Sequence, residues 1–244
     1  QDVFHQYFFP FTEGFRYADA NDLDSVKAQA DDTTCAVMLE LIQGEGGVLP
    51  LDKDFIQALA AWCQENDYLL LVDEVQTGVG RTGSLFCFQQ YDIQPDAVTF
   101  AKGIAGGLPM AGVMCSEKCR NVLGPGTHAT TFGGNPIAAA GANVVLDELD
   151  DAMLAEVNQK GEYLKSAIAA FDSPYVDTVR GMGLMIGIVL KEGVDRSALV
   201  KALYDHNLLV LTAGPKTIRL LPPLVISQEE MDTGLAALKD VLVP

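Results

Sequence analysis

Short runs of consecutive apolar residues alternate with helical patterns through the first 150 residues of this 244-residue chain. Apolar runs of this kind are typical of strands in a parallel sheet that is covered on both faces. The spacing predicts helices over 53–65 and 137–149, the second with Pro136 in its first turn, where proline is tolerated. The predicted strands are 35–40, 68–72, 96–101 and 111–115.

The pattern changes after residue 150, where a long helical pattern is followed by apolar runs with a further helix among them. Ser227 is the expected cap of the last helix, with Glu230 at the capping-box position. The predicted strands are 181–190, 208–211 and 217–221, and the predicted helices are 152–171, 197–206 and 227–242. We therefore expect a large domain over residues 1–148 and a smaller domain over residues 149–244.

Two of the predicted strands are followed by a charged residue. Asp73 comes directly after 68–72, and Lys102 comes directly after 97–101. Open α/β sheets bind ligands at the carboxyl ends of their strands, and a buried amine there loses its proton readily and can attack a carbonyl carbon. Taken singly, the alternatives are an aspartate that caps a turn and a lysine that reaches solvent at the rim.

Together, a carboxylate and an amine at one rim suit a cofactor that needs a protonated ring nitrogen and a nitrogen that traps its carbonyl group. Pyridoxal phosphate has both needs. No GxGxxG follows an early strand, so a dinucleotide-binding oxidoreductase is disfavoured.

Charge and composition exclude several classes of partner. Sixteen basic and 33 acidic residues give a formal charge of −17, which repels nucleic acid and anionic membrane surfaces. The chain has no apolar stretch near the roughly 20 residues of a membrane span. Five cysteines without CxxC spacing favour a reducing cytoplasm and predict no metal site. Because the chain opens at Gln1, we expect it to be a piece of a longer protein.

Four ordered motifs resemble those of class III aminotransferases, which depend on pyridoxal phosphate, and most closely the type that acts on acetylornithine. Several motifs in one order are more specific than any single glycine pattern. The motifs are DEVQTGVGRTG at 73–83, AKGIAGGLP at 101–109, TFGGNP at 131–136, and LTAGP with IRLLPPL at 211–224. The resemblance covers essentially the whole chain. It implies an α/β fold of the aspartate aminotransferase type, with a partial large domain built on a mainly parallel sheet and a smaller α+β C-terminal domain.

The resemblance also implies roles for individual residues. Lys102 would hold pyridoxal 5′-phosphate covalently and move protons, and Asp73 would pair with the ring nitrogen; these two are the expected catalytic residues. Val75 would pack on the ring, and Gln76 would bind its phenolic oxygen. The expected cofactor-binding residues are Asp73, Glu74, Val75, Gln76, Lys102 and Thr131.

Three further residues would bind the substrate. Thr130 matches a position near it, and Arg219 matches the arginine that binds the α-carboxylate of glutamate or 2-oxoglutarate; a planar guanidinium fork suits a carboxylate. The alternative for Arg219 is the solvent face of an edge strand. Glu45 matches a movable cover on that arginine and has glycine on both sides, which gives it freedom.

The resemblance implies transfer of an amino group between N-acetylornithine and 2-oxoglutarate, in arginine biosynthesis. Ornithine, succinylornithine and 4-aminobutyrate are alternative donors, and a noncatalytic truncated scaffold is an alternative of another class. Because Thr131 matches a residue that serves across a subunit interface, a homodimer is expected. Members of the family are longer, and the upstream region that this chain lacks supplies a phosphate-binding helix N-terminus, a stacking aromatic and a substrate-binding arginine.

Overall fold

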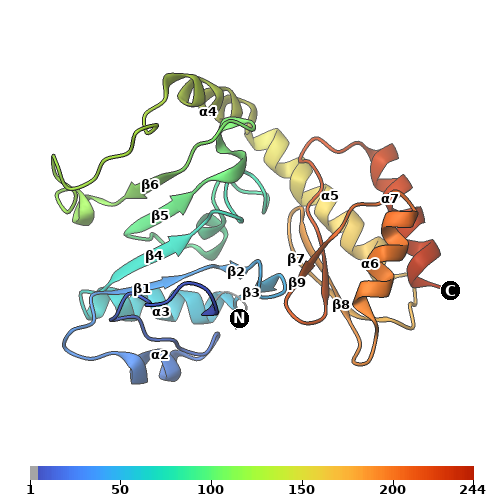
Figure 1. Cartoon of the computed structure of the whole chain (residues 1–244), viewed down its shortest axis with the longest axis horizontal. Coiled ribbons are helices and arrows are strands. Elements are labelled where there is room, and N and C mark those ends of the chain that lie inside the picture. Colours follow the sequence, from blue (N-terminus) through green and yellow to red (C-terminus); the bar gives the residue numbers. More distant parts are fainter. Residues whose placement is uncertain (1–4) are drawn as a thin grey trace.

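The computed structural model describes residues 5–244 and shows two lobes, each built on its own sheet (Figure 1). The first sheet has the strand order β1-β4-β5-β6, and the second has the order β7-β8-β10-β9. A short hairpin, β2 (Ile42–Gln43) and β3 (Leu49–Pro50), lies between the lobes.

The first sheet is mainly parallel, as expected. Its first three strands in spatial order pair in parallel, and only β6 runs antiparallel to its neighbour. Its strands are β1 (Ala36–Leu39), β4 (Leu69–Asp73), β5 (Ala97–Phe100) and β6 (Gly112–Cys115). Because parallel strands end at the same edge of a sheet, the residues that follow β1, β4 and β5 come close together. The expected α/β architecture with a mainly parallel sheet is confirmed.

The helices of the first lobe cover this sheet and cap its loops. Helix α3 buries Ile56, Leu59 and Cys63, and the side chain of Asn135 caps α4 just before Pro136. The helical segments are α2 (Leu23–Gln29), α3 (Lys53–Glu65), α4 (Pro136–Glu148), η1 (Cys87–Tyr91), η2 (Lys102–Ala105) and η3 (Glu117–Cys119). The sequence pattern did not predict α2, because seven residues give too little periodicity.

Helices of the second lobe pack on one face of its sheet (Figure 1). Ser227 and Glu230 form the predicted capping box of α7. The elements are α5 (Asp151–Ala169), β7 (Val176–Met182), β8 (Met185–Leu190), α6 (Arg196–Asp205), β9 (Leu211–Ala213), β10 (Thr217–Leu220) and α7 (Gln228–Leu242). The core between helices and sheet includes Ile186, Ile188, Leu190 and Ile218, all of them fully buried.

The expectation of one strand over 181–190 is wrong. The chain forms two antiparallel strands, β7 and β8, which pair from Val176 with Leu190 to Met182 with Met185. Gly183 makes the turn with a positive φ of 52°, and a side chain there would meet the backbone of Thr82. The apolar pattern is the same on both sides of the turn, so in the sequence only Gly183 indicated where the chain reverses.

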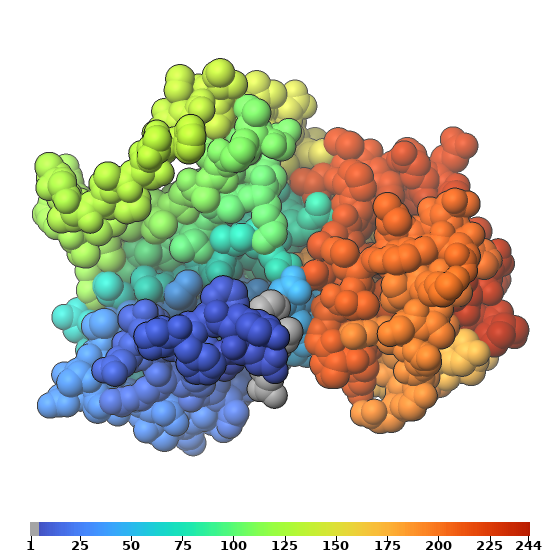
Figure 2. Space-filling view, viewed as in Figure 1, coloured from blue at the N-terminus to red at the C-terminus, as the bar shows by residue number. Residues whose placement is uncertain are grey.

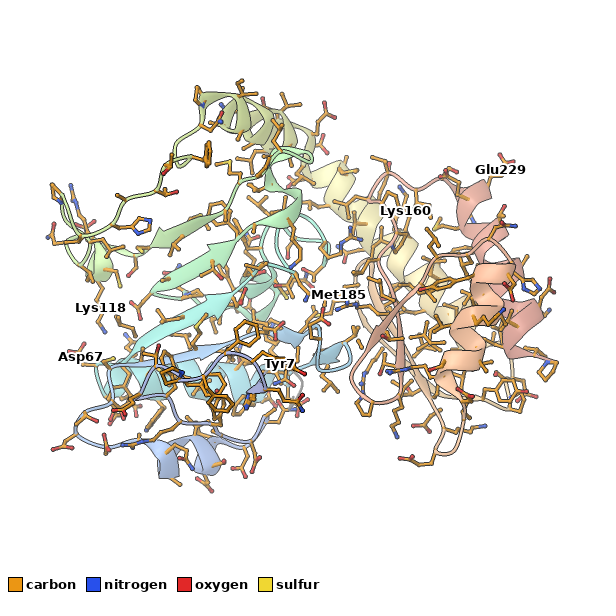
Figure 3. All side chains as sticks on the ribbon, in the orientation of Figure 1. Tyr7, Asp67, Lys118, Lys160, Met185 and Glu229 are labelled. Carbon is orange, nitrogen blue, oxygen red and sulfur yellow. The ribbon has the colours of Figure 1, made fainter. Side chains whose placement is uncertain are left out.

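The two lobes meet along the other face of the second sheet. Met185 is fully buried in the core of the first lobe, and Figure 3 shows it between the lobes. Arg81 donates to the carbonyl oxygens of Leu184 and Pro222, more than 100 residues away in sequence. The space-filling view shows the loops of the first lobe in direct contact with the second (Figure 2). Helix α4 ends at Glu148, and the domain boundary after that residue stays a prediction.

None of the helices in residues 5–244 combines the length and the apolar character that crossing a bilayer requires.

Candidate functional site

Charged residues stand at the carboxyl ends of three neighbouring parallel strands. Glu40 follows β1, Asp73 ends β4, and Lys102 follows β5 by two positions. Asp73 lies opposite Thr99 in the register of β4 and β5. Because β1, β4 and β5 pair in parallel, all three residues lie at one edge of the sheet, and both Asp73 and Lys102 act electrostatically on the pKa of Glu40. The structure therefore brings Asp73 and Lys102 together at one edge of the sheet.

Asp73 is held by one of its two carboxylate oxygens. Oδ1 accepts hydrogen bonds from the backbone N–H of Val75 at 2.9 Å and from the hydroxyl of Thr99 at 3.1 Å. Among the described residues, no donor reaches Oδ2. The carboxylate is thus fixed in direction while one charged oxygen remains for a ligand.

Lys102 begins the turn η2 with a positive φ of 52°, which is uncommon for a residue with a side chain. The expectation that it is buried is wrong, because the side chain is exposed. Ile104 and Ala105 are the residues of this turn that pack inward, against α4, and they leave Lys102 at the open rim. Within residues 5–244 its amine makes no hydrogen bond or ion pair.

Glu40 is a member of this site that the sequence analysis missed. The rule that selected Asp73 and Lys102, a charge directly after an apolar strand, would have found it. Burial raises its pKa above the ordinary value, and the negative charges of Asp73 and Glu45 act in the same direction. The backbone N–H of Gly44 donates to its carboxylate at 3.0 Å and opposes this shift.

A second cluster joins the two lobes. Arg219 Nη1 donates to Glu45 Oε1 at 2.7 Å and to Gln76 Oε1 at 3.1 Å, and Gln76 Nε2 donates to Glu45 Oε1 at 3.1 Å. Glu45 comes from the loop between β2 and β3, Gln76 from the loop after β4, and Arg219 from β10. These three residues make a closed triangle of hydrogen bonds.

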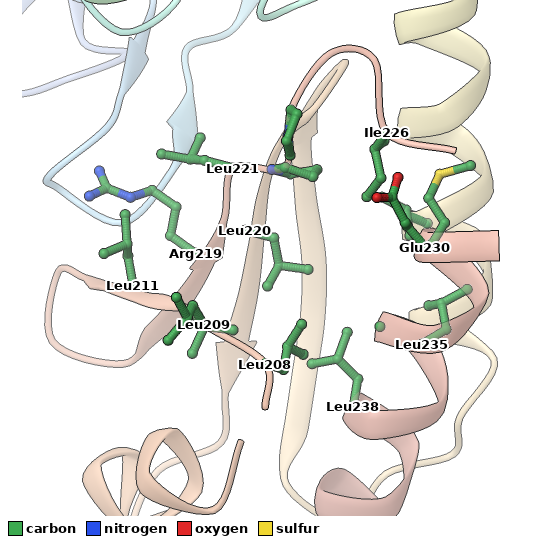
Figure 4. Close-up of a pocket in the computed structure, with 16 residues that line it drawn as sticks. Leu208, Leu209, Leu211, Arg219, Leu220, Leu221, Ile226, Glu230, Leu235 and Leu238 are labelled. Carbon is green, nitrogen blue, oxygen red and sulfur yellow. The ribbon is translucent and has the colours of Figure 1, made fainter. Parts of the chain in front are cut away.

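Arg219 lies in an interior strand of the second sheet, since β10 runs between β8 and β9. Its neighbours Ile218 and Leu220 pack into the helix-covered core, and Figure 4 shows Arg219 extending away from Leu235 and Leu238 of α7. The side chain is 7% exposed. Its Nε is buried, and in the part of the chain that the structure describes it has no hydrogen-bond partner.

Glu45 connects this cluster to the rim. Partial burial pushes its pKa up, but the hydrogen bonds from Arg219 and Gln76 outweigh that effect, so the pKa lies below its usual value. The positive charge of Lys102 contributes in the same direction. Lys102, Glu40, Asp73, Glu45 and Arg219 therefore belong to one electrostatically connected site.

Glu74 is not part of this ligand-facing set, and its expected place at the cofactor is corrected. Its buried carboxylate accepts hydrogen bonds from the Thr77 hydroxyl at 2.6 Å and from the backbone N–H groups of Cys87 and Phe88 at 2.9 and 2.8 Å. Successive residues of a strand point to opposite faces, so Asp73 faces the site while Glu74 holds the turn at η1.

The structure does not bring Thr130 and Thr131 to the rim. Both lie in the exposed segment 120–137, between η3 and the start of α4, and neither is hydrogen bonded to Lys102 or Asp73 among the described residues. The single chain thus assembles the lysine, the aspartate and the arginine with its glutamate, but not the two threonines.

Comparison with known proteins identifies the family of the chain. The family described as aminotransferase class-III matches residues 4–242 of the chain. The acetylornithine aminotransferase of Haemophilus ducreyi is 45% identical over 243 residues, covering 99% of this chain and 61% of the relative. That of Streptococcus mutans is 48% identical over 232 residues, covering 93% and 60%.

Solved structures give the same family. The N-acetylornithine aminotransferase of Stenotrophomonas maltophilia is 38% identical, with a TM-score of 0.86, 95% of this chain and 62% of that one covered. An ornithine aminotransferase of Toxoplasma gondii is 29% identical, with a TM-score of 0.92, and the match covers 100% of this chain and 59% of that one. That protein was crystallized in the presence of oxidized glutathione and has PLP at partial occupancy in its active site.

The chain spans about three fifths of the length of the curated relatives it matches. The family match covers nearly all of its residues. The chain therefore belongs to the class-III aminotransferases.

Proposed function

We propose that the protein containing this chain is a pyridoxal-phosphate-dependent aminotransferase that moves an amino group between N-acetylornithine and 2-oxoglutarate. One observation carries the proposal: Asp73 ends β4 and Lys102 follows β5, and because these strands pair in parallel both residues lie at one edge of the sheet. The names of the curated relatives support the choice of acetylornithine. The ornithine aminotransferase among the similar structures keeps ornithine as an alternative donor, beside succinylornithine and 4-aminobutyrate.

The groups at the rim fit this cofactor. Asp73 offers a charged Oδ2 to a protonated ring nitrogen, because its Oδ1 is already occupied. Lys102 offers an amine at the open rim to the aldehyde carbon. When bound, pyridoxal phosphate supplies a ring that accepts the electron pair released as the C–H bond breaks on the substrate carbon that carries the transferred amine.

The remaining steps fall to side chains of this chain. Lys102 Nζ would hold the cofactor through its aldehyde carbon and, once freed from it, would take the proton from the substrate carbon that carries the transferred amine. Asp73 Oδ2 keeps the proton on the ring nitrogen, because a charge of opposite sign favours the charged form. Val75 would pack on the ring, and the Gln76 amide would bind its phenolic oxygen.

Glu45 and Arg219 select the substrate. While Glu45 is paired with Arg219, the site accepts an ω-amine, which brings no carboxylate to this position. When Glu45 withdraws, Arg219 binds the α-carboxylate of 2-oxoglutarate or glutamate. The half-exposed position of Glu45, at 47%, gives it room to withdraw.

A second copy of the chain completes the site in our proposal. Thr131 would hold the cofactor phosphate of the partner subunit, and Thr130 would lie near its substrate. The segment that carries them exposes several large apolar side chains, which a homodimer interface would cover: Val122, Leu123, Phe132 and Ile137.

We assign the reaction to arginine biosynthesis in the cytoplasm. The cysteines of residues 5–244 are all free, which is consistent with a reducing compartment.

Visible absorbance after addition of pyridoxal phosphate tests the proposal. The unaltered protein should develop a band of lysine-bound cofactor, and borohydride reduction followed by peptide mapping should place the label on Lys102. Lys102→Ala should lose both. Lys201→Ala is the matched control, because this exposed lysine pairs only with Asp205 on its own helix.

A normal band in Lys102→Ala would remove Lys102 from its role. The alternative of a noncatalytic scaffold predicts that the exposed Lys102 binds no cofactor. Calorimetry separates the two, since a scaffold takes up no pyridoxal phosphate while the proposed enzyme binds it stoichiometrically.

A further inference from the structure

Arg180 and Arg219 stand in one row across the second sheet, with a glycine between them. Gly187 of β8 is the register partner of Arg180 in β7 and also of Arg219 in β10. Register partners on neighbouring strands point to the same face, and neighbouring strands are about 4.8 Å apart. Two guanidinium side chains therefore flank a residue without a side chain, on the face that meets the first lobe.

The loop 44–48, which carries Glu45, fills this gap. Val48 is fully buried over Gly187, where an added Cβ would lie 2.9 Å from the Cβ of Val48. Val48 also has a φ of 53°, which is a genuine outlier for a β-branched residue. Such a conformation persists only where the surroundings fix it. The hairpin that bears this loop reaches toward the second lobe in Figure 1.

Arg180 fixes the loop just after Glu45. Its Nη2 and Nε donate to the carbonyl oxygen of Gly47 at 2.8 and 3.3 Å. No carboxylate pairs with it among the described residues, and burial lowers its pKa. Arg180 is partly buried and directs two hydrogen bonds to one carbonyl group, so its role is to hold that piece of backbone.

The backbone of Glu45 itself is fixed from the other side. Its carbonyl oxygen accepts the N–H of Gly214 at 2.8 Å, and the carbonyl oxygen of Gly214 accepts from Arg196 Nη1 at 2.6 Å. Loop 44–48 is thus attached to the second lobe at Glu45, Gly47 and Val48. The glycines beside Glu45 therefore do not leave a mobile loop.

We propose that Arg180 is a specificity-determining positioning residue: it holds loop 44–48 so that Glu45 competes with a dicarboxylate for Arg219. This inference rests on the proposed function, which makes Arg219 the carboxylate-binding residue. When the backbone of loop 44–48 is fixed, Glu45 loses less conformational entropy as it pairs with Arg219. Arg180 therefore makes Glu45 a stronger competitor of a dicarboxylate for Arg219. The switch is then a rotation of one side chain over a fixed backbone.

Hydrogen exchange on the cofactor-free chain tests the clamp directly. Arg180→Gln should speed exchange at least tenfold in the peptides that contain 44–48 and Gly214, and should leave β4 unchanged. Arg180→Lys keeps the charge but loses the planar guanidinium fork, so its exchange rates in these peptides should lie between those of the unaltered protein and Arg180→Gln. Arg120→Gln is the matched control, because it removes the same charge from an exposed arginine that pairs with Glu117. Unchanged exchange at 44–48 in Arg180→Gln would overturn the clamp.

Glutarate binding, measured by calorimetry, tests the effect on specificity. Glutarate has two carboxylates and neither an amino nor a keto group, so it reports binding without reaction. Arg180→Gln should tighten glutarate binding about three- to tenfold when Glu45 is present, and by less than twofold in the Glu45→Ala background. Equal weakening in both backgrounds would show that Arg180 binds the ligand or only supports the fold, and it would overturn the inference, as would no change in either.

The two experiments separate this inference from the function on which it rests. If no variant binds glutarate, the proposed dicarboxylate site fails, while the exchange rates still decide whether Arg180 holds the loop. If glutarate binds as expected but Lys102 takes up no cofactor, the aminotransferase proposal fails and the clamp stands.

Discussion

Arg219 and Glu45 lie 174 residues apart in the chain and form an ion pair, with Nη1 2.7 Å from Oε1. Arg219 comes from an interior strand of the second lobe, and Glu45 from a loop of the first that is attached to that same sheet. The pair exists only where the lobes meet. In the proposed function it covers the guanidinium group that binds a substrate carboxylate, and the positive charge of Lys102 also acts on Glu45.

Removing the cover should change substrate preference. In the active protein, Glu45→Ala should raise the rate with glutamate relative to the rate with the ω-amine. A half-exposed ion pair contributes about 1 kcal/mol, so the ratio of the two half-reaction rates should rise about fivefold. Stopped-flow absorbance gives both rates. Glu117→Ala, which breaks an exposed pair elsewhere, should leave the ratio alone, and an unchanged ratio in Glu45→Ala would count against the switch.

Arg219→Lys keeps the charge but loses the planar fork. A charge-assisted hydrogen bond contributes about 2 kcal/mol, so the KM for 2-oxoglutarate should rise roughly 30-fold. The half-reaction with the ω-amine should change by less than about threefold, because it places no carboxylate on this residue. Steady-state kinetics with each substrate varied in turn measures both. An equal loss with both substrates would contradict the assigned role.

Glu74→Ala should destabilise the fold without acting on the ligand. The change leaves the buried N–H groups of Cys87 and Phe88 and the hydroxyl of Thr77 without their acceptor. An unsatisfied buried group costs about 1 to 3 kcal/mol, so we expect a loss of about 3 kcal/mol in the free energy of unfolding, measured by urea titration. Glu74→Gln, which keeps one oxygen acceptor, should lose less. A loss below about 1 kcal/mol in the alanine variant would refute this account of Glu74.

Glu40 should make stability depend on pH. Burial raises its pKa in the folded chain above the ordinary value of 4.5, so the folded state holds this proton more tightly than the unfolded state does. The wild-type chain therefore loses stability as pH rises from 4.5 through the raised pKa. Glu40→Gln retains an oxygen for the N–H of Gly44 and has no proton to lose.

Urea midpoints at pH 4, 5.5 and 7 check this prediction. The stability of Glu40→Gln relative to the wild type should increase over this series and level off above the raised pKa. Glu74 also has a pKa raised by burial, but it is present in both proteins and cancels in the difference. A constant difference across the series would mean that Glu40 is not desolvated as described.

Local patterns were enough to find the rim of the first sheet. Asp73 and Lys102 each follow an apolar run, and the parallel pairing of β4 and β5 puts such positions side by side. The same rule applied to β1 gives Glu40. The limits of α3 at 53–65 and the capping box at Ser227 were also predictable, because periodicity and capping depend on residues within a few positions of one another.

By itself, then, the sequence determined the α/β class, most helices and strands, and two charges at one rim. Tertiary structure alone decided that Lys102 is exposed and Glu74 buried, that Arg219 meets Glu45, and that Arg180 holds the loop beside it. The physical reason is range. Exposure and ion pairing depend on which distant segments pack over a residue, and no pattern of neighbouring residues contains that information.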